Sequence, residues 1–314
     1  MNPLASIFGA GVRVKNTLYD RRLFRSRGLQ GPVISVGNLS LGGSGKTPFV
    51  ILLGGLLKAR GIQFDILSRG YGRQTRGVRL VDPTGASQEF GDEPLLLARR
   101  LGVPVIVGER RHEAGVFAEQ KFGPQFHLLD DGFQHRALAR NFDIVLLTAD
   151  DARDRLLPAG RLREPLTSLC RADAVVLSPD DSPQYLPRKD QLVWQVRRGI
   201  LPQDVPSRPA VFCGIARPRK FVSQLRAAGI EPAAERFYRD HHAYTEGDVR
   251  ELLEMRERSG AGGFVTTEKD AINLGQHIER LRPLSVIRVQ MELMDAANAV
   301  DTVLSVIAER RRRA

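Results

Sequence analysis

The feature that most constrains the fold is a glycine-rich segment that follows a short β-branched stretch, at residues 33–47, VISVGNLSLGGSGKT. It ends in Gly45-Lys46-Thr47, and the segment beginning with Pro48 is typical of a helix, whose first turn tolerates proline. Glycines let the backbone N–H groups of such a loop converge on phosphate oxygens, and the dipole of the next helix adds to the attraction. The strand, loop and helix together predict an α/β protein with a P-loop.

The last two residues of the P-loop each have an expected ligand. Lys46 would reach the β- and γ-phosphates of a nucleotide, and the Thr47 hydroxyl would bind Mg²⁺. The pattern G-x-x-x-x-G-K-[ST] is incomplete because Ser40 stands at its first glycine, and Gly37, Gly42 and Gly43 are expected to supply the turn instead. The alternative is a strand–helix connection without a ligand. The expected nucleotide-binding residues are Ser40, Leu41, Gly42, Gly43, Ser44, Gly45, Lys46 and Thr47.

Apolar segments alternate with helical segments through the first half of the chain. Strands are predicted at 62–67, 104–107, 126–129, 143–148 and 173–178. Continuous apolar strands of this kind indicate a buried, mostly parallel sheet. Polar and charged groups follow the carboxyl ends of these strands, which is where ligands bind in open α/β sheets.

The pattern changes after residue 178, where a proline- and aspartate-rich stretch is followed by a segment that resembles a linker. We therefore expect a P-loop NTPase-like, mostly parallel α/β sheet flanked by helices, with a second, smaller α/β domain. The predicted division is a membrane-associating amphipathic helix (1–28), a P-loop kinase domain (29–185), a linker (186–209) and the smaller C-terminal α/β domain (210–314).

Two pairs of acids are candidates for the chemistry. Asp130 and Asp131 follow an apolar strand, as the acid that completes a P-loop Mg²⁺ site does; the alternative is an ordinary turn. Asp92 and Glu93 begin a predicted helix, where they either complement the helix dipole or, in a phosphotransferase, supply the group that accepts the substrate hydroxyl proton.

Histidines and arginines add further candidates. His241 and His242 are adjacent in a loop of the second unit, which suggests either proton handling or the capping of the next helix; metal binding is not expected because no third ligand stands at a suitable spacing. Arginines near the ends of the predicted strands would hold phosphates and neutralise developing charge, or would be solvated surface residues. These arginines are Arg69, Arg73, Arg110, Arg111, Arg161 and Arg163.

The net charge and the N-terminus point to an anionic partner. The chain has 47 Lys and Arg residues against 36 Asp and Glu residues, a formal net charge of +11. Apolar residues at helical spacing within 4–24, followed by basic residues, fit an amphipathic helix in an anionic membrane interface. The alternative is a helix that packs on the protein body and has a solvated basic face. No run of 18 apolar residues occurs, so no ordinary transmembrane helix is expected.

Nine segments, taken together, resemble one family. In chain order they are ISVGNLSLGGSGKTP, LSRGYGR, GDEP, VGERR, DDGFQHRAL, AGRLREP, FCGIARP, RDHHAY and TTEKDA. The family is tetraacyldisaccharide 4'-kinase, the lipid A 4'-kinase of Gram-negative bacteria, and the resemblance covers essentially the whole chain. It implies transfer of the ATP γ-phosphate to the 4'-hydroxyl of a tetraacyldisaccharide 1-phosphate, which gives lipid IVA.

The resemblance also implies cofactors, location and residue roles. The cofactors are ATP and Mg²⁺, and the enzyme is peripheral, on the cytoplasmic face of the inner membrane, with neither a nucleic acid nor an obligate protein as partner. The implied catalytic residues are Asp92, His241 and Lys46, with His242 left open as the alternative partner of Asp92. The implied phosphate-binding arginines are Arg111 and Arg163. The implied metal-site or nucleotide-cleft residues are Thr47, Glu93, Asp130, Asp131 and Glu164.

Two other functions fit part of the pattern. A P-loop GTPase or metallochaperone-like ATPase would release the γ-phosphate as free phosphate and would not transfer it to a glycolipid. A nucleic-acid-binding module would account for the basic charge, but only 6% of the residues are aromatic and no basic–aromatic stacking motif occurs.

Overall fold

The structure is a computed structural model that describes residues 3–181, 186 and 191–313. The predicted boundary at residue 185 and residues 187–190 of the predicted linker lie outside the described residues. The same holds for the first two residues of the predicted 1–28 segment and for the last residue of the predicted C-terminal domain.

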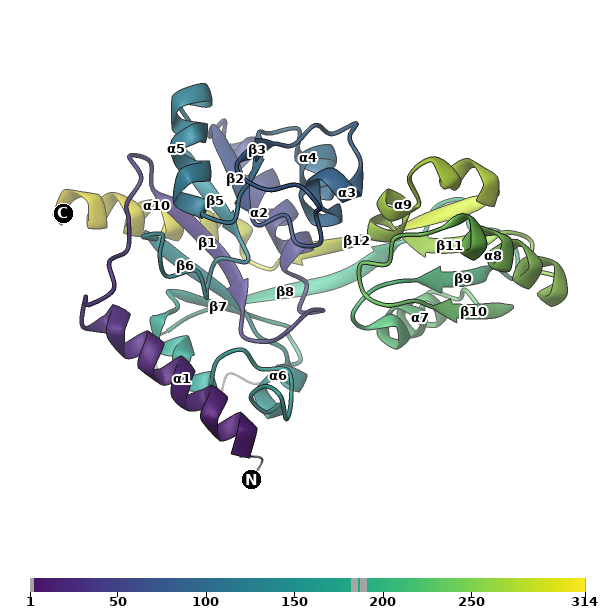
Figure 1. The fold of residues 1–314 in the computed structure, drawn as a ribbon, viewed down its shortest axis with the longest axis horizontal. Coiled ribbons are helices and arrows are strands. Elements are labelled where there is room, and N and C mark those ends of the chain that lie inside the picture. Colours follow the sequence, from purple (N-terminus) through teal and green to yellow (C-terminus); the bar gives the residue numbers. More distant parts are fainter. Residues whose placement is uncertain (1–2, 182–185, 187–190, 314) are drawn as a thin grey trace.

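Strands and helices alternate along most of the chain (Figure 1). The strands are β1 (Val33–Asn38), β2 (Phe64–Ser68), β3 (Arg79–Leu80), β4 (Val105–Val107), β5 (Phe126–Asp130), β6 (Phe142–Leu146), β7 (Ala174–Leu177), β8 (Leu192–Leu201), β9 (Ala210–Cys213), β10 (Ala234–Phe237), β11 (Phe264–Thr267) and β12 (Leu284–Leu293). The α-helices are α1 (Pro3–Asp20), α2 (Lys46–Ala59), α3 (Ser87–Phe90), α4 (Asp92–Leu101), α5 (Arg111–Phe122), α6 (Ala149–Arg153), α7 (Pro218–Ala227), α8 (Glu246–Ser259), α9 (Glu268–Leu274) and α10 (Ala296–Arg313), and the 3-10 helices are η1 (Leu166–Arg171) and η3 (Gly275–Leu281).

Among the described residues, twelve strands form one sheet in the order β10-β9-β11-β12-β8-β7-β6-β1-β5-β2-β4-β3. From β7 to β4 every neighbouring pair is parallel, and β3 adds an antiparallel edge. The prediction of a mostly parallel sheet flanked by helices is therefore confirmed. Because β1 lies between β6 and β5, its carboxyl end, and the loop that follows it, stand in the middle of this part of the sheet.

Helices cover both faces of the first part of the sheet. Ile34 and Val36 of β1 join the core formed with α2, α4 and α10, whereas Val33 belongs to the core formed with α5. This division follows from the alternation of side chains along a strand. Both faces are apolar, which explains why the strands are continuous apolar runs in the sequence.

The long strands β8 and β12 connect the two parts of the molecule (Figure 1). The start of β8 is parallel to β7, and its second half pairs antiparallel with β12 from Val196–Leu293 to Leu201–Arg288. The segment predicted as a linker therefore contains a ten-residue strand. The partner of its second half, β12, is distant in the sequence, so the local pattern of loop-forming residues does not reveal that pairing.

The C-terminal helix α10 belongs to the first part of the molecule, although the sequence assigned it to the smaller domain. Ala299, Val300, Val303 and Ile307 are buried in the core that α2 and α4 form on the sheet. These positions form an apolar stripe of helical spacing, which predicts a packed helix but does not say which core it joins.

The second part continues the sheet as β10-β9-β11-β12, with parallel pairing throughout. Phe212 of β9 packs in the core with α8 and η3, while Val211 and Cys213 pack on α7. The second α/β unit of the prediction is thus present, with helices on both faces of the sheet.

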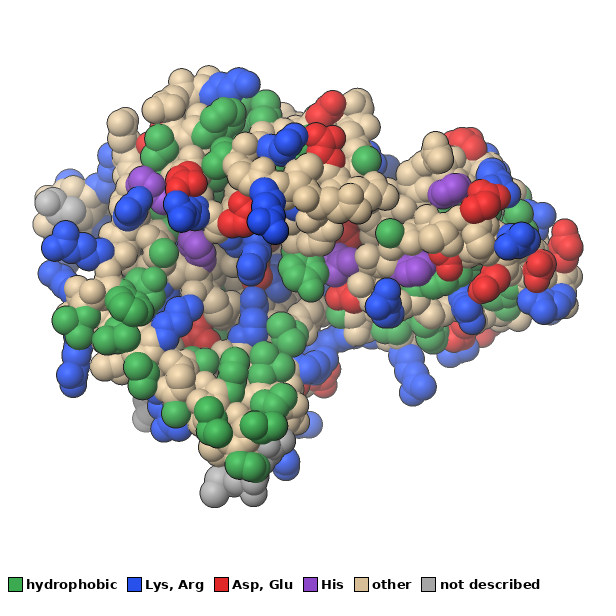
Figure 2. All heavy atoms as spheres, in the orientation of Figure 1, with side chains coloured by type: hydrophobic (Ala, Val, Ile, Leu, Met, Phe, Trp, Pro, Cys, Tyr) green, Lys and Arg blue, Asp and Glu red, His purple; other side chains and the backbone are tan. Residues whose placement is uncertain are grey.

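Helix α1 packs on the body of the protein through one side only. Gly9 is buried, and Asn16 donates a hydrogen bond of 2.8 Å to Glu164, while Ile7 and Val14 are 69% and 60% exposed. In Figure 2 apolar side chains gather over this helix. Within the described ranges, no helix is both long enough and apolar enough to cross a membrane.

Candidate functional site

The P-loop leaves β1 at Asn38 and enters α2 at Lys46. Gly42, Gly43 and Gly45 have φ values of 62°, 74° and 89°, which lie in the left-handed region that favours glycine. Gly45 is the N-cap of α2. Gly42 and Gly43 thus shape the turn as expected, and Gly45 does so with them, whereas Gly37, which was also expected to supply the turn, lies within β1.

The second part of the molecule covers this loop. A Cβ atom on Gly43 would lie 2.8 Å from Nε of Arg217, and one on Gly45 would lie 2.6 Å from Cε of Met291. Arg217 precedes α7 of the second part, whereas Met291 lies on the connecting strand β12 and is buried in the core of the first part, so the P-loop lies at the junction of the two parts. Its glycines serve both the backbone conformation and this close approach.

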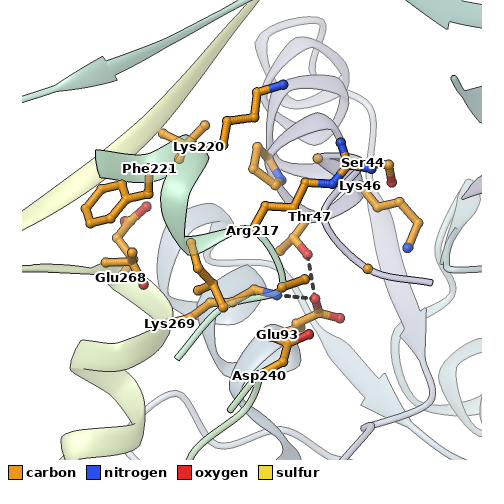
Figure 3. A pocket seen from close by; sticks show the side chains of 18 of the residues that line it. Ser44, Lys46, Thr47, Glu93, Arg217, Lys220, Phe221, Asp240, Glu268 and Lys269 are labelled. Atoms are coloured by element: carbon orange, nitrogen blue, oxygen red, sulfur yellow. Dashed lines mark hydrogen bonds and ion pairs between the residues drawn. The ribbon is translucent and has the colours of Figure 1, made fainter. Parts of the chain in front are cut away.

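A cavity of about 150 Å³ opens beside the loop (Figure 3). Residues from both parts of the molecule line it, and in the P-loop the lining begins at Gly42. Acids and bases gather near Lys46 and Thr47, and apolar side chains line the remainder. The charged lining residues are Lys46, Glu93, Arg198, Arg217, Lys220, Asp240, His241, Glu268 and Lys269, and the apolar ones include Ile51, Leu96, Phe221, Ile287 and Val289.

The P-loop lysine is held by two side chains from neighbouring strand ends. Lys46 Nζ donates to Asn38 Oδ1 at 3.0 Å and lies 3.5 Å from Asp131 Oδ1. Arg163 binds both oxygens of Asp131, at 2.8 and 2.9 Å, and also contacts Asn38. Burial alone would raise the pKa of Asp131, but the charges of Lys46 and Arg163 hold it well below its usual range. Asp131 and Arg163 are thus brought together with Lys46, as an ion-paired cluster.

The P-loop threonine faces an acid of α4. Thr47 Oγ1 donates to Glu93 Oε1 at 3.2 Å, and the same oxygen forms an ion pair with Lys269 of α9. Burial would raise the pKa of Glu93, but Lys269 lowers it below its usual value. Sequence reasoning placed Thr47 and Glu93 in one metal site and did not assign a role to Lys269.

Asp130 lies buried at the end of β5, close to Glu93 and Asp131. Burial and the charges of Glu93 and Asp131 raise the pKa of Asp130 to about 7. Ser68 donates to Asp130 Oδ2 at 3.2 Å, whereas Oδ1 is buried and has no hydrogen-bond partner among the described residues. The part of the chain that the structure describes contains no group of three or more His, Cys, Asp or Glu side chains arranged to hold a metal.

A carboxylate–imidazole pair spans the two parts of the molecule. His241 Nδ1 lies 2.8 Å from Oδ2 and 3.0 Å from Oδ1 of Asp92, and Asn273 donates to Oδ2 at 3.2 Å. Burial would lower the pKa of His241, but the hydrogen bond and charge of Asp92 raise it above its usual value. Burial likewise would raise the pKa of Asp92, but the hydrogen bond from His241 and the charge of Lys269 lower it.

The two adjacent histidines have different partners. His242 Nε2 contacts Asp248 at 3.1 Å, and Asp248 also caps α8 through Thr245. His241 has φ 59° and its backbone N–H donates to the carbonyl of Gly214. The geometry thus places His241, and not His242, against Asp92.

Arg111 and Glu164, two further residues predicted for the site, form hydrogen bonds with partners other than the site residues described above. Arg111 is buried with its Nε lacking a partner among the described residues, and burial and the charge of Arg69 lower its pKa to about 10. Glu164 accepts hydrogen bonds from Arg171 and Asn16, so its carboxylate fixes α1 and η1 instead of facing Thr47. Three of the remaining arginines pair with nearby acids, namely Arg73 with Glu109, Arg110 with Glu113 and Arg161 with Asp154.

Sequence reasoning missed residues whose contacts depend on the tertiary fold. Asn38 was visible only as the last residue of the strand before the P-loop, and Asn273 and Lys269 as parts of a helix in the second unit. Lys269 lies in the segment TTEKDA, which carried the family resemblance but no role. None of these residues has a local pattern that indicates its partner.

Comparisons with known proteins identify the family. A family model described as LpxK, tetraacyldisaccharide-1-P 4'-kinase, matches residues 1–308. A tetraacyldisaccharide 4'-kinase from Koribacter versatilis is 51% identical over 99% of this chain and 100% of its own length. One from Chlorobaculum parvum is 40% identical over 86% of this chain and 82% of its own length.

A solved structure shares the fold. It is the crystal structure of LpxK from Aquifex aeolicus in complex with ATP, with a TM-score of 0.78 and 33% sequence identity, over 97% of each chain. These matches favour a kinase over the GTPase-like ATPase and the nucleic-acid-binding module. The chain belongs to the tetraacyldisaccharide-1-phosphate 4'-kinase family.

Proposed function

We propose that this protein transfers the γ-phosphate of ATP to the 4'-hydroxyl of tetraacyldisaccharide 1-phosphate, which gives lipid IVA. The proposal rests on one observation, namely that the P-loop and a histidine of the second part of the molecule line the same cavity. The P-loop residues Lys46 and Thr47 line one cavity with His241, whose imidazole contacts Asp92. Family membership names the acceptor.

The cavity suits a nucleotide in one orientation. The triphosphate lies over the P-loop, where backbone N–H groups and the start of α2 attract anions. The base and ribose lie against the apolar lining, which includes Ile51, Phe221 and Val289. The ATP complex of the Aquifex aeolicus relative supports this choice of nucleotide.

The acids beside Thr47 fit Mg²⁺. The buried Oδ1 of Asp130 has no partner among the described residues, and oxygen atoms are the ligands that Mg²⁺ prefers. Thr47, Glu93 and Asp130 would hold the ion together with phosphate oxygens and water, since Mg²⁺ usually relies on its nucleotide for several ligands. When bound, the ion neutralises charge on the phosphates.

Asp92 is the proposed acceptor of the substrate hydroxyl proton. Its pKa is lowered, so it is ionised near neutral pH and ready to take a proton. His241 and Asn273 fix the orientation of its carboxylate through the contacts described above. A base in this position raises the nucleophilicity of the sugar oxygen as it approaches the γ-phosphate.

Basic side chains stabilise the charge that develops on the transferred group. Asn38 and Asp131 hold the ammonium group of Lys46 at the strand ends beside the P-loop. Arg163, which binds Asp131, and the buried Arg111 add positive charge at the same strand ends. Electrostatic stabilisation of this kind is the main protein contribution to phosphoryl transfer.

Helix α1 is the proposed contact with the membrane that holds the acylated acceptor. Its outer side exposes Ile7 and Val14, and its inner side packs on the protein. An amphipathic helix with basic residues nearby binds anionic lipid surfaces. We place the enzyme peripherally on the cytoplasmic face of the inner membrane, where ATP is available.

The test is direct phosphate transfer. The purified protein is incubated with γ-labelled ATP, Mg²⁺ and tetraacyldisaccharide 1-phosphate in detergent, and the lipid is separated by chromatography. Label in the bis-phosphorylated lipid supports the proposal. Label found only in free phosphate would reject it in favour of a hydrolase.

A further inference from the structure

Lys269 extends from the second part of the molecule into the proposed metal site. It lies at the second position of α9, and its Nζ forms an ion pair with Oε1 of Glu93. The same oxygen accepts the Thr47 hydroxyl bond at 3.2 Å. Figure 3 shows both contacts converging on one carboxylate oxygen. The ammonium group therefore occupies the side of Glu93 that faces the P-loop threonine.

The surroundings of Lys269 are rich in negative charge. Asp92, Glu93 and Asp240 all act on its ammonium group, and Asp92 and Asp130 are buried. Buried carboxylates that lie close together repel one another unless a cation lies between them. Lys269 is the cation that forms an ion pair with Glu93, and the charge of Lys46 acts on Glu93 as well.

Helix α9 remains attached to α4 independently of this lysine. Arg100 binds Glu268 at 2.7 Å, and Asn273 donates to Asp92 at 3.2 Å. The Lys269 side chain can therefore leave Glu93 by rotation about its own bonds, with the helix staying in place. Lysine has four flexible side-chain carbons, which makes such a movement accessible.

We infer that Lys269 is a built-in counter-cation of Glu93, which a divalent metal ion must displace before it binds. The inference rests on the proposed metal role of Glu93. Its consequence is an order of events: the metal binds weakly to the free protein and well only when the nucleotide phosphates add their own negative charge. Lys269 thereby couples metal binding to nucleotide binding.

The experiment measures Mn²⁺ binding to the full-length protein by electron paramagnetic resonance of the free ion, without nucleotide. Lys269→Met is expected to bind Mn²⁺ roughly tenfold more tightly than the wild type, because a competing charge next to the ligand is removed. Lys269→Arg keeps the charge and should bind within about twofold of the wild type. The matched control is Lys220→Met, which removes a charge from the same cavity at a residue with no ion pair in the described ranges, and should also stay within about twofold.

Several results overturn the inference. Unchanged or weaker Mn²⁺ binding by Lys269→Met would do so, as would an equal gain in Lys220→Met, which would indicate a general effect of charge. Weaker binding of metal-free ATP by Lys269→Met at unchanged Mn²⁺ affinity would make Lys269 a phosphate ligand instead. If Lys269→Met does not fold, Lys269→Gln carries the same test, because its amide can still donate to Glu93.

A second measurement separates this inference from the proposed function. Mn²⁺ binding is repeated with saturating ATP for the wild type and for Glu93→Gln, and protein-bound Mn²⁺ is separated by equilibrium dialysis from the Mn²⁺ that ATP holds in solution. If ATP does not promote Mn²⁺ binding in the wild type, or if Glu93→Gln binds as the wild type does, the metal role of Glu93 fails and the inference fails with it. If both controls behave as expected and Lys269→Met is unchanged, only the counter-cation role is rejected.

Discussion

Nδ1 of His241 lies 2.8 Å from Oδ2 of Asp92, although 149 positions separate the two residues in the chain. The pair joins the start of α4, in the first part of the molecule, to a loop of the second part. The imidazole both orients the carboxylate and lowers its pKa. The orientation of the proposed proton acceptor thus depends on the contact between the two parts.

Asp92→Asn should reduce kcat by roughly 10²- to 10⁴-fold, because general base catalysis contributes about that factor. The affinity for ATP should change little, since Asp92 is proposed to act on the acceptor. Steady-state kinetics and nucleotide titration measure the two quantities. The matched control is Asp248→Asn, which alters the carboxylate beside the neighbouring histidine. Near-normal kcat for Asp92→Asn would remove this residue from the chemistry.

His241→Gln and His242→Gln should differ in their pH profiles. Removing His241 takes away the group that lowers the pKa of Asp92, so the acidic limb of kcat should move to higher pH. His242→Gln should leave that limb in place, since His242 contacts Asp248. The profiles are measured from about pH 3 to 9, because the usual pKa of an aspartate is about 4 and that of Asp92 is lowered. Identical profiles for the two variants would contradict the assignment of His241.

Gly43→Ala should weaken ATP binding by roughly tenfold or more, because φ of 74° is unfavourable for alanine and its Cβ would lie 2.8 Å from Arg217. Gly55→Ala is the control, since it lies within α2 and its Cβ would meet nothing within 4 Å. Alanine is the better helix former by about 1 kcal/mol, so Gly55→Ala should raise stability and leave ATP binding unchanged. Calorimetric titration and thermal unfolding test both variants. Wild-type affinity in Gly43→Ala would show that this conformation is not required.

Val14→Asp should reduce binding to anionic vesicles, because it places a charge on the exposed apolar side of α1. Thr17→Asp adds the same charge at another exposed position of the helix and should have the smaller effect. Vesicle co-sedimentation measures binding, and unfolding temperatures verify that both variants fold. Equal losses in the two variants would mean that net charge, and not the apolar side, governs binding.

Stability should depend on pH through a buried histidine near the amino end of β5. His127 Nδ1 lies 3.0 Å from Asp65, and Nε2 lies 3.3 Å from Glu119. Burial would lower the pKa of His127, but both carboxylates raise it above its usual value. A raised pKa in the folded state stabilises the fold fully below about pH 6.5, and this contribution is lost as the pH rises through the folded pKa.

The test compares urea unfolding of the wild type with that of the double variant Asp65→Asn/His127→Gln. The difference in free energy of unfolding should fall as the pH rises from about 6 to 9, since only the wild type loses the imidazolium. A difference that stays constant or grows over this range would mean that His127 is neutral in the folded protein.

Local patterns were sufficient for the central part of the fold. The P-loop requires glycines at defined positions and a helix directly after them, and both are properties of adjacent residues. Continuous apolar strands alternating with helices predict a parallel sheet because burial on both faces leaves no room for polar alternation. The strand ends therefore located Lys46, Thr47, Asp130 and Asp131 before any contact was known.

Tertiary structure decided which distant segments meet. The apolar stripe of α10 fits either core, and only packing places it on α2. β8 gains its strand conformation from hydrogen bonds to β7 and to β12, which lies far along the chain.

The pairing of Asp92 with His241 and of Glu93 with Lys269 likewise requires the second part of the sheet to bring α9 and its neighbouring loop against α4. The sequence by itself determined the phosphate-binding loop and the parallel sheet, because short-range backbone and burial rules are written in neighbouring residues. Only the fold determined the partners of each charged group, because such contacts depend on where separate segments pack in space.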